Sequence, residues 1–289
     1  MTGSLLLHAP TALEYFASLV ADDASLSVIE AATAIAHDDY PALDCQAVLG
    51  EIDALAARLK ARIAADAAPL QRLRLLNRFF FQELGFAGNV NDYYDAKNSY
   101  LHCVLQTRRG IPITLAALYA EIAGQAGLHA SGVSFPGHFL VKLRMPQGEV
   151  VIDPFTGQSM SREALEALLV PYRRRQSLPG SSSLPLALFL QPATPREIIA
   201  RMLRNLKEIH RSADDWVRLH AVLQRLVILL PEAWEERRDR GLAAAQLGAV
   251  KSAVADLSTY LEHVPHAGDR SAIHERLLEL GPGDPSRLH

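Results

Sequence analysis

The sequence has few cysteines, no long apolar run and little net charge, and each shortage excludes a class of protein. Of its 289 residues only Cys45 and Cys103 are cysteines, which argues against a disulfide-stapled secreted fold and for a reducing compartment. No stretch has the roughly 18 uninterrupted apolar residues of a membrane-spanning helix. A formal charge of -3 gives no general attraction to nucleic acid or anionic lipid. We therefore expect a cytoplasmic protein that binds neither nucleic acid nor membranes.

Sequence signatures of metal and phosphate sites are also absent. Neither a Cys-x-x-Cys nor a His-Glu-x-x-His motif occurs, and no glycine-rich phosphate loop is present. The adjacent pair His102 and Cys103 is too short to form such a motif. We therefore expect no metal and no cofactor.

What the sequence does contain is apolar residues, at 49%, in patterns that predict many helices. Spacing of three and four residues predicts helices in the first half of the chain, over 11–35, 45–63, 69–84, 98–106 and 112–126. Asp23 is the expected cap of the second part of the first helix, and Asn98 that of the fourth. Short β-like runs follow at 131–135, 139–145 and 150–152, and then a helix over 161–169.

A single tract rich in proline, glycine and serine divides the chain. It predicts a linker over 176–194, between a first domain at 1–175 and a helical domain at 195–281.

The helical domain carries signs of a repeat. Its prolines, Pro195, Pro231 and Pro265, recur at intervals typical of a 34-residue helix-turn-helix unit. Small residues at Gly241 and Ala253 would let two antiparallel helices approach closely. The pattern predicts about one and a half tetratricopeptide repeats and a capping helix. Because one repeat cannot bury its own apolar face, the array needs the first domain or a partner to cover it, and a homodimer is one such arrangement.

Five sequence blocks in order resemble one bacterial family. They are Asn91-Asp92-Tyr93-Tyr94-Asp95 with Asn98-Ser99-Tyr100-Leu101, then Arg109 to Leu115, Pro136 to Leu140, Ile152 to Phe155, and Arg238 to Gly241. The family has a transglutaminase-like core followed by tetratricopeptide repeats, and its members are often named after the invasion regulator SirB. The resemblance implies an α-rich α+β fold, with a papain-like core of helix plus antiparallel sheet.

The resemblance also implies where a catalytic triad would lie. In the wider superfamily a cysteine begins a buried helix, and a histidine and an aspartate on neighbouring strands activate it. His138 and Asp153 match the last two positions. The nucleophile position falls near Pro112, where Ile111 and Ile113 offer neither thiol nor hydroxyl. This departure indicates a pseudoenzyme.

Three interpretations of His138 and Asp153 stay open. They are structural and satisfy buried backbone groups. Alternatively, they mark a former catalytic cleft that binds a ligand, with Tyr94, Asp95 and Asn98 at its rim. In the third interpretation the site is catalytic, with Cys103 as a displaced nucleophile.

Two functions follow from these interpretations. The leading hypothesis is a non-catalytic, regulatory protein that binds a protein or peptide partner. It would use the cleft near His138 and Asp153 together with the repeat surface, where the cations Arg237, Arg238, Arg240 and Lys251 suit an acidic peptide. The alternative is a cysteine-dependent hydrolase or acyl transferase that uses Cys103, His138 and Asp153.

Overall fold

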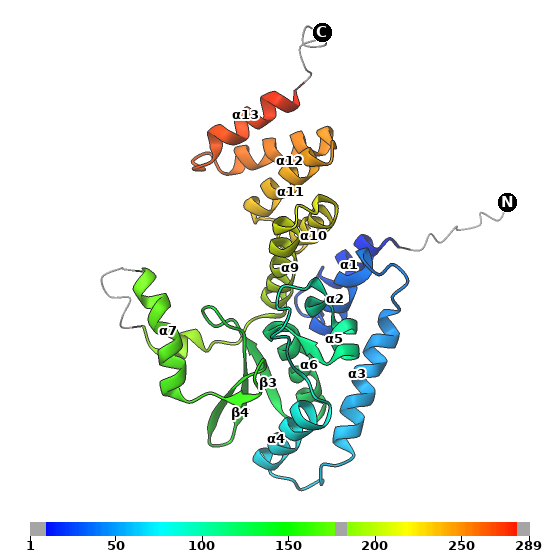
Figure 1. Cartoon of the computed structure of the whole chain (residues 1–289), viewed down its shortest axis with the longest axis vertical. Coiled ribbons are helices and arrows are strands. Elements are labelled where there is room, and N and C mark those ends of the chain that lie inside the picture. The colour runs from blue at the N-terminus through cyan, green and yellow to red at the C-terminus, as the bar shows by residue number, and fades with distance from the viewer. Residues whose placement is uncertain (1–9, 177–183, 282–289) are drawn as a thin grey trace, which may run out of the picture. The chain divides into compact units, whose positions relative to one another are not determined.

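The chain forms two compact units, which the computed structural model describes over residues 10–176 and 184–281 (Figure 1). The sheet unit comprises Asp22–Met202, and the repeat unit combines Met1–Ala21 with Leu203–His289. Helices predominate in both units, and a small antiparallel sheet lies in the sheet unit. The predicted α-rich α+β class is confirmed.

The sheet unit begins with helices that follow the predicted apolar periodicity. Their bounds are α2 (Val28–Ala34), the 3₁₀ turn η1 (Ile35–Asp38), α3 (Cys45–Lys60), α4 (Pro69–Asn77) and the π-helical turn η2 (Arg78–Glu83). The cap predicted at Asp23 is wrong, because the Ser27 hydroxyl accepts the Glu30 amide at 3.3 Å and begins α2. Helix α4 runs directly into η2, and the two end before Gly85. The φ of +73° at Gly85 suits a residue without a side chain.

The segment between these helices and the sheet differs from its prediction. Residues 98–106 do not form one helix: the 3₁₀ turn η3 (Ala96–Ser99) precedes α5 (Leu101–Thr107). Tyr100 stands before α5 without a side-chain cap bond, so the cap predicted at Asn98 is wrong. Two short strands, β1 (Ala87–Gly88) and β2 (Arg109–Gly110), pair in parallel on either side of this segment.

Helix α6 (Pro112–Gln125) is the centre of the sheet unit. Pro112 occupies its first turn, where the missing N–H costs no hydrogen bond, and Gly127 follows its end at φ +77°. Nine of its residues are buried, so the helix is apolar around most of its circumference. It packs against α3 and also against the sheet, and the predicted helix at 112–126 is confirmed.

The sheet has four antiparallel strands in the order β3-β4-β5-β6. Their bounds are β3 (His129–Val133), β4 (Leu140–Met145), β5 (Gly148–Asp153) and β6 (Gln158–Ser159). The register pairs Val133 with Leu140, and Val141 with Ile152. Successive side chains point to opposite faces, so Val141 and Ile152 share a face, and α6 packs against β3 and β4.

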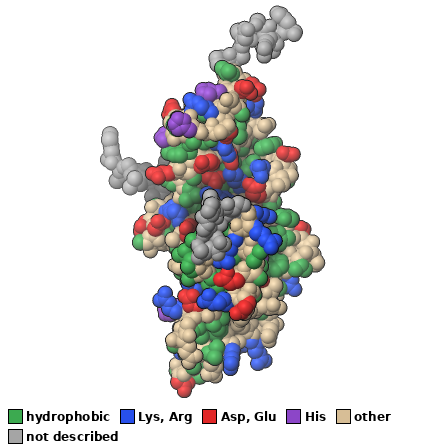
Figure 2. Space-filling view, turned by 90° about the vertical axis from the view of Figure 1, so that its left-hand side faces the viewer, with side chains coloured by type: hydrophobic (Ala, Val, Ile, Leu, Met, Phe, Trp, Pro, Cys, Tyr) green, Lys and Arg blue, Asp and Glu red, His purple; other side chains and the backbone are tan. Residues whose placement is uncertain are grey.

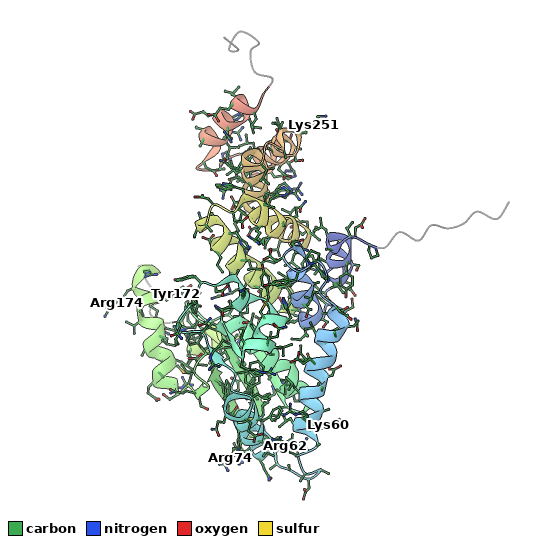
Figure 3. The ribbon with its side chains drawn as sticks, turned by 45° about the vertical axis from the view of Figure 1, so that its right-hand side comes forward. Lys60, Arg62, Arg74, Tyr172, Arg174 and Lys251 are labelled. Atoms are coloured by element: carbon green, nitrogen blue, oxygen red, sulfur yellow. The ribbon has the colours of Figure 1, made fainter. Side chains whose placement is uncertain are left out.

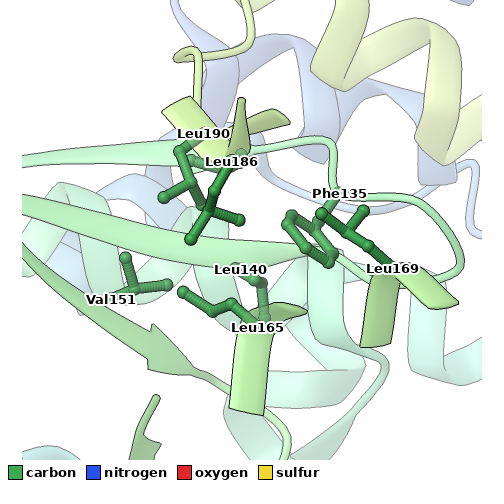
Figure 4. Packing of buried hydrophobic residues seen from close by; sticks show 8 residues of the cluster. Phe135, Leu140, Val151, Leu165, Leu169, Leu186 and Leu190 are labelled. Carbon is green, nitrogen blue, oxygen red and sulfur yellow. The ribbon is translucent and has the colours of Figure 1, made fainter. Parts of the chain in front are cut away.

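The other face of the sheet is covered at one end. Val133, Leu140 and Val151 pack there against Leu165 and Leu169 of α7 (Arg162–Gln176), and Leu186 of α8 (Leu186–Phe189) joins the same cluster (Figure 4). Helix α7 runs beyond the predicted 161–169. The polar residues farther along β3 and β4 are not part of this cluster.

In the repeat unit α10 packs on α11, α11 on α12 and α12 on α13 (Figure 1). Its helices are α1 (Ala12–Leu19), the end of α9 (Pro195–Ser212), α10 (Trp216–Leu229), α11 (Trp234–Gln246), α12 (Val250–His263) and α13 (Arg270–Leu280). Helix α1 packs on α10, where Arg225 lies over the Phe16 ring at 5.6 Å from its centroid. The first helix therefore contributes to the unit at the other end of the sequence.

Gly241 sets the spacing of α11 and α12. A Cβ atom there would lie 2.9 Å from Cγ of Leu257 and 3.0 Å from Cβ of Asp256, closer than side chains pack. Ala253 is fully buried in the same helix pair. The predicted close approach of two helices at small residues is confirmed.

The predicted linker 176–194 falls partly on residues 177–183, which lie outside the described residues, so the domain boundaries stay a prediction. None of the helices within the described ranges is both long and apolar enough to cross a membrane. Acidic and basic side chains are interspersed over the face shown in Figure 2, consistent with the small net charge.

Candidate functional site

His138 and Asp153 lie at the same end of the β4–β5 hairpin, because the register pairs Val141 with Ile152. His138 closes a turn: its amide donates to the Phe135 carbonyl at 2.9 Å after Gly137, which has a φ of +73°. The His138 side chain is exposed. The two positions therefore lie near each other through the hairpin register, and their role as a site stays a prediction.

Asp153 uses its carboxylate to shape its own turn. Oδ1 accepts the Phe155 amide at 2.9 Å, and Oδ2 accepts the Thr156 hydroxyl at 2.9 Å. Among the described residues no hydrogen bond or ion pair joins Asp153 to His138. The aspartate thus orients the chain between β5 and β6 in this structure, and its pairing with His138 stays a prediction.

The beginning of α6 carries no free nucleophile. Ile111 precedes the helix without a side-chain cap bond, and Pro112 follows. The nearest hydroxyl, that of Thr114, is fully buried and donates to the Asn98 carbonyl at 2.8 Å, with the Ile111 carbonyl at 3.0 Å. The Thr114 hydroxyl therefore links α6 to the preceding turn by a buried hydrogen bond.

Cys103 lies on α5, and its side chain contacts His102 and Tyr40 rather than the other residues of the predicted triad. Its sulfur is 3.3 Å from Nε2 of His102 and donates to the Tyr40 hydroxyl at 3.6 Å. The side chain is 7% exposed, and burial raises the pKa of its thiol above the usual value. Within the described residues no hydrogen bond links Cys103 to His138 or Asp153.

The surroundings of Cys103 form a hydrogen-bonded cluster that sequence reasoning missed. Burial lowers the pKa of His102, and burial together with the neighbouring Cys103 raises the pKa of Tyr40 to about 12. The rings of Tyr40 and His102 meet edge to face at 4.4 Å, and the Tyr100 hydroxyl donates to Asp39 at 2.7 Å. A thiol beside a neutral imidazole and a neutral phenol is a poor nucleophile, because only the thiolate attacks. The adjacency of His102 and Cys103 was the sequence signal.

Asn98 holds the loop that carries the predicted rim. Its amide donates to the carbonyls of Asp92 at 2.6 Å and Tyr93 at 3.2 Å, and its oxygen accepts from Asn89 at 3.0 Å. Asn98 is only 3% exposed. Asp95 accepts the Lys97 amide at 2.9 Å and so begins η3. The buried asparagine therefore positions the loop from within.

This loop presents an aromatic surface to solvent. Tyr94 is 78% exposed, and the Tyr93 ring lies 5.3 Å from it and 5.9 Å from Phe155. Phe155 lies directly over Gly88, where a Cβ atom would be 2.3 Å from the ring. Burial raises the pKa of Tyr93, Tyr94 adds to this effect, and Arg201 opposes it. The surface joins residues that are distant in the sequence.

Arg201 connects this surface to the turn that carries His138. It donates to the Ser134 hydroxyl at 3.0 Å and lies over the Phe139 ring, 5.9 Å from its centroid. Burial lowers the pKa of the Arg201 guanidinium. No local signal in the sequence could have identified this residue, because its partners precede it by more than sixty positions.

The repeat unit contains a groove of about 620 Å³. Its walls come from α9, α10, α11 and α13, and Trp216, Leu219 and Leu223 form part of its apolar lining. Four cations and two carboxylates line it as well: Lys207, Arg211, Arg238, Arg276, Asp239 and Asp269. The groove is therefore amphipathic, and its lining holds more cations than carboxylates, although three of these cations also pair with glutamates outside the lining.

Three of the four cations predicted for an acidic peptide lie elsewhere. Arg240 makes two bonds of 2.6 and 2.7 Å to Asp256, and Arg237 lies 3.7 Å from the same carboxylate. Lys251 is exposed on α12 (Figure 3). Only Arg238 lines the groove, where it pairs with Asp239 and Asp269 at 2.7 Å each.

The part of the chain that the structure describes holds no cluster of three or more histidine, cysteine or acidic residues able to bind a metal ion.

Comparison with known proteins supports the two-part organisation. Residues 46–204 match a family model described as the transglutaminase-like superfamily, and residues 206–278 match a tetratricopeptide repeat. The predicted order of a transglutaminase-like region and then repeats is confirmed. No solved structure matches the chain.

Relatives in several bacteria cover nearly the same length. A UPF0162 protein of Xylella fastidiosa is 37% identical over 261 residues, which is 90% of this chain and 92% of the relative. One of Pseudomonas aeruginosa is 30% identical over 264 residues, or 91% of this chain and 94% of the relative. The UPF0162 protein YchA of Escherichia coli is 29% identical over 231 residues, 78% of this chain and 81% of the relative. The chain therefore belongs to the UPF0162 family, with a region of the transglutaminase-like superfamily followed by tetratricopeptide repeats.

Proposed function

We propose that this protein binds a peptide segment of a protein partner and transfers no acyl group. The observation that carries the proposal is the groove of about 620 Å³ in the repeat unit. Stacked helix pairs use such concave surfaces to bind extended or helical peptides. The regulatory role implied by the resemblance to SirB, and a cytoplasmic location, are part of the same hypothesis.

The composition of the groove indicates the chemistry of its ligand. Trp216, Leu219 and Leu223 offer an apolar surface for one or two apolar side chains of a peptide. Arg211 and Arg276 lie at the same groove, with side chains 62% and 32% exposed. Four cations against two carboxylates favour a segment that carries Asp or Glu beside its apolar anchors.

The chemistry of the sheet unit supports the non-catalytic half of the proposal. An acyl transferase needs a thiolate or an activated hydroxyl near its histidine. Thr114 is buried in an internal hydrogen bond, and burial raises the pKa of Cys103. In this proposal the exposed Tyr94, Asp95 and the turn of His138 and Asp153 form a second contact surface. The proposed regions 1–175 and 195–281 then act as two binding modules.

The test for the groove is peptide selection on the intact chain. Peptides from a random display library are selected on the full-length protein, and their affinities are measured by fluorescence anisotropy. We expect enriched peptides to carry acidic residues beside apolar ones. Replacing both Arg211→Gln and Arg276→Gln should weaken binding about tenfold, because charge-assisted contacts at the rim are lost.

The matched control is Lys251→Gln, an exposed cation outside the groove lining (Figure 3). It should leave affinity unchanged. The groove is not the binding site if the control weakens binding as much as the double variant, or if no peptide is enriched.

The non-catalytic half has its own test. The intact chain is treated with iodoacetamide at neutral pH, and modified cysteines are located by mass spectrometry. We expect slow modification of Cys103, with the same rate in the His138→Ala variant. Fast, selective labelling of Cys103 that disappears in His138→Ala would instead support the hydrolase or acyl transferase.

A further inference from the structure

A second cavity lies on the open part of the sheet, within the sheet unit. It measures about 250 Å³ and is lined by six residues: His129, Ser131, Lys142, Arg144, Glu149 and Pro192. None of them belongs to the predicted triad or to the aromatic surface. The groove in the repeat unit and this cavity share no residue.

Strand register explains why these residues meet. His129 pairs with Arg144 and Ser131 with Lys142 across β3 and β4, and Arg144 pairs with Glu149 across β4 and β5. Directly paired residues point to the same face with Cβ atoms about 5 Å apart. Three strands therefore bring five polar side chains into one array.

The array continues the face that carries the apolar cluster of Figure 4. Val133, Leu140 and Val151 lie on this face at the end covered by α7 and α8. On the same face, two residues farther along the strands, the pair Ser131 and Lys142 follows the pair Val133 and Leu140. The helices thus leave a polar end of the sheet accessible next to a packed core.

The segment after α8 completes the cavity wall. The Ala193 amide donates to the Gly132 carbonyl at 2.9 Å, which fixes Pro192 beside β3. The wall is therefore held to the strand by a backbone hydrogen bond.

Charge within the cavity is unevenly satisfied. Lys142, with a side chain only 14% exposed, pairs with Glu149 at 3.0 Å. Arg144 stands opposite both Glu149 and His129 in the register, yet it makes no ion pair with any described residue. One guanidinium is left with its donors available beside an imidazole and a hydroxyl.

We infer that this cavity binds a small oxyanion, the phosphate or carboxylate group of a small molecule. Arg144 supplies a planar pair of charged donors, and Ser131 and His129 add neighbouring hydrogen-bond donors. The volume is below the roughly 300–1,000 Å³ of sites for drug-sized ligands, so the cavity suits the acidic group and little else. Glu149 holds Lys142 and limits the anion to low charge.

The experiment titrates the full-length protein with inorganic phosphate and, separately, with acetate at low ionic strength. Amide chemical shifts from nuclear magnetic resonance locate the site and give the affinity. We expect saturable shifts at residues of β3 and β4 around Ser131 and Arg144. Preference for phosphate or for acetate tells which acidic group the cavity takes.

Two substitutions should change phosphate affinity in opposite directions. Arg144→Gln should weaken it about tenfold or more, because it removes the charged donor pair. Glu149→Gln should strengthen it severalfold, because the carboxylate no longer repels the anion or occupies Lys142. A purely structural cross-strand charge pair would give no such opposition.

Arg74→Gln is the matched control, an exposed arginine on α4 in the same unit (Figure 3). It should leave the affinity unchanged. The inference is overturned if neither anion gives saturable shifts at β3 and β4, or if Arg74→Gln weakens binding as much as Arg144→Gln does.

Discussion

Buried polar side chains differ in kind between the two units. Those of the sheet unit are uncharged at neutral pH: Thr33, Asn98, Ser99, His102 and Thr114. Those of the repeat unit are histidine or charged: His210, Arg225, Glu236 and Asp256. The same chain thus fills one interior with neutral hydrogen bonds and the other with ions.

The difference follows from how the layers are built. In the sheet unit α6 lies between α3 and the sheet, and its buried residues are mostly apolar. In the repeat unit small residues, Gly241 and Ala253, stand where α11 and α12 meet. Charged side chains are buried in the same helices, Glu236 on α11 and Asp256 on α12. A thin helical array therefore depends on ion pairs that a layered core does not need.

The largest expected effect is at Asp256, which tests this dependence. Asp256→Ala leaves Arg240 and Arg237 without their shared carboxylate. Both guanidiniums are largely but not fully buried, with side chains 22% and 25% exposed, so leaving them unpaired should lower the free energy of unfolding by about 3 kcal/mol. Urea denaturation followed by tryptophan fluorescence measures it, since the two tryptophans, Trp216 and Trp234, both lie in the repeat unit. A loss below about 1 kcal/mol would show that the ion pairs are dispensable.

A somewhat smaller effect is expected at Asn98, the counterpart in the sheet unit. Asn98→Ala removes the bonds to Asp92, Tyr93 and Asn89, and we expect a loss of about 2 kcal/mol. Amide hydrogen exchange of residues 89–95 should accelerate, because the loop loses its internal support. Unchanged exchange would mean that the loop is held by other contacts.

The third prediction concerns the pH dependence of stability, through a buried thiol of the sheet unit. Burial, with Glu30 and Asp44 nearby, raises the pKa of Cys45 from 9.0 to about 11. The unfolded chain then loses this proton first, so the contribution to stability is complete below pH 9.0 and is lost as the pH rises toward 11. Between pH 8 and pH 10.5 the wild type should lose about 1 to 2 kcal/mol more than Cys45→Ala. Urea unfolding followed by circular dichroism checks this, and parallel losses in both proteins would contradict it.

The smallest effect is expected at an exposed ion pair of the repeat unit. Arg276 and Glu279 lie 2.7 Å apart, but the glutamate side chain is 63% exposed. Glu279→Gln should change stability by less than about 0.5 kcal/mol, because water competes for both partners. Comparison with Asp256→Ala under the same conditions shows whether burial decides the importance of an ion pair. Equal effects at both sites would remove the distinction.

Local patterns in the sequence predicted much of the fold. Apolar spacing was enough for α3, the same spacing with Pro112 and Gly127 near the ends was enough for α6, and the turn at Gly148 was enough for the hairpin of β4 and β5. The caps at Asp23 and Asn98 were predicted wrongly, because both residue types bind backbone in turns as readily as at helix ends. Asn98 in particular supports a loop from within.

The candidate sites depended more on distant contacts. The sequence placed His138 and Asp153 at one end of a hairpin, but not the bonds that Asp153 makes to its own turn. Nor could it place Arg201 beside Ser134 and Phe139. The cavity of β3 to β5 needed the register of three strands, which alternation alone leaves open.

By itself the sequence determined the longer helices, the hairpin of β4 and β5, and the order of the transglutaminase-like and repeat regions, because apolar period and turn residues act locally. Tertiary structure alone decided which charges are neutralised, which thiol is enclosed and which polar residues of the sheet share a cavity. These properties depend on burial and on distances between residues far apart in the chain, which local sequence patterns do not specify.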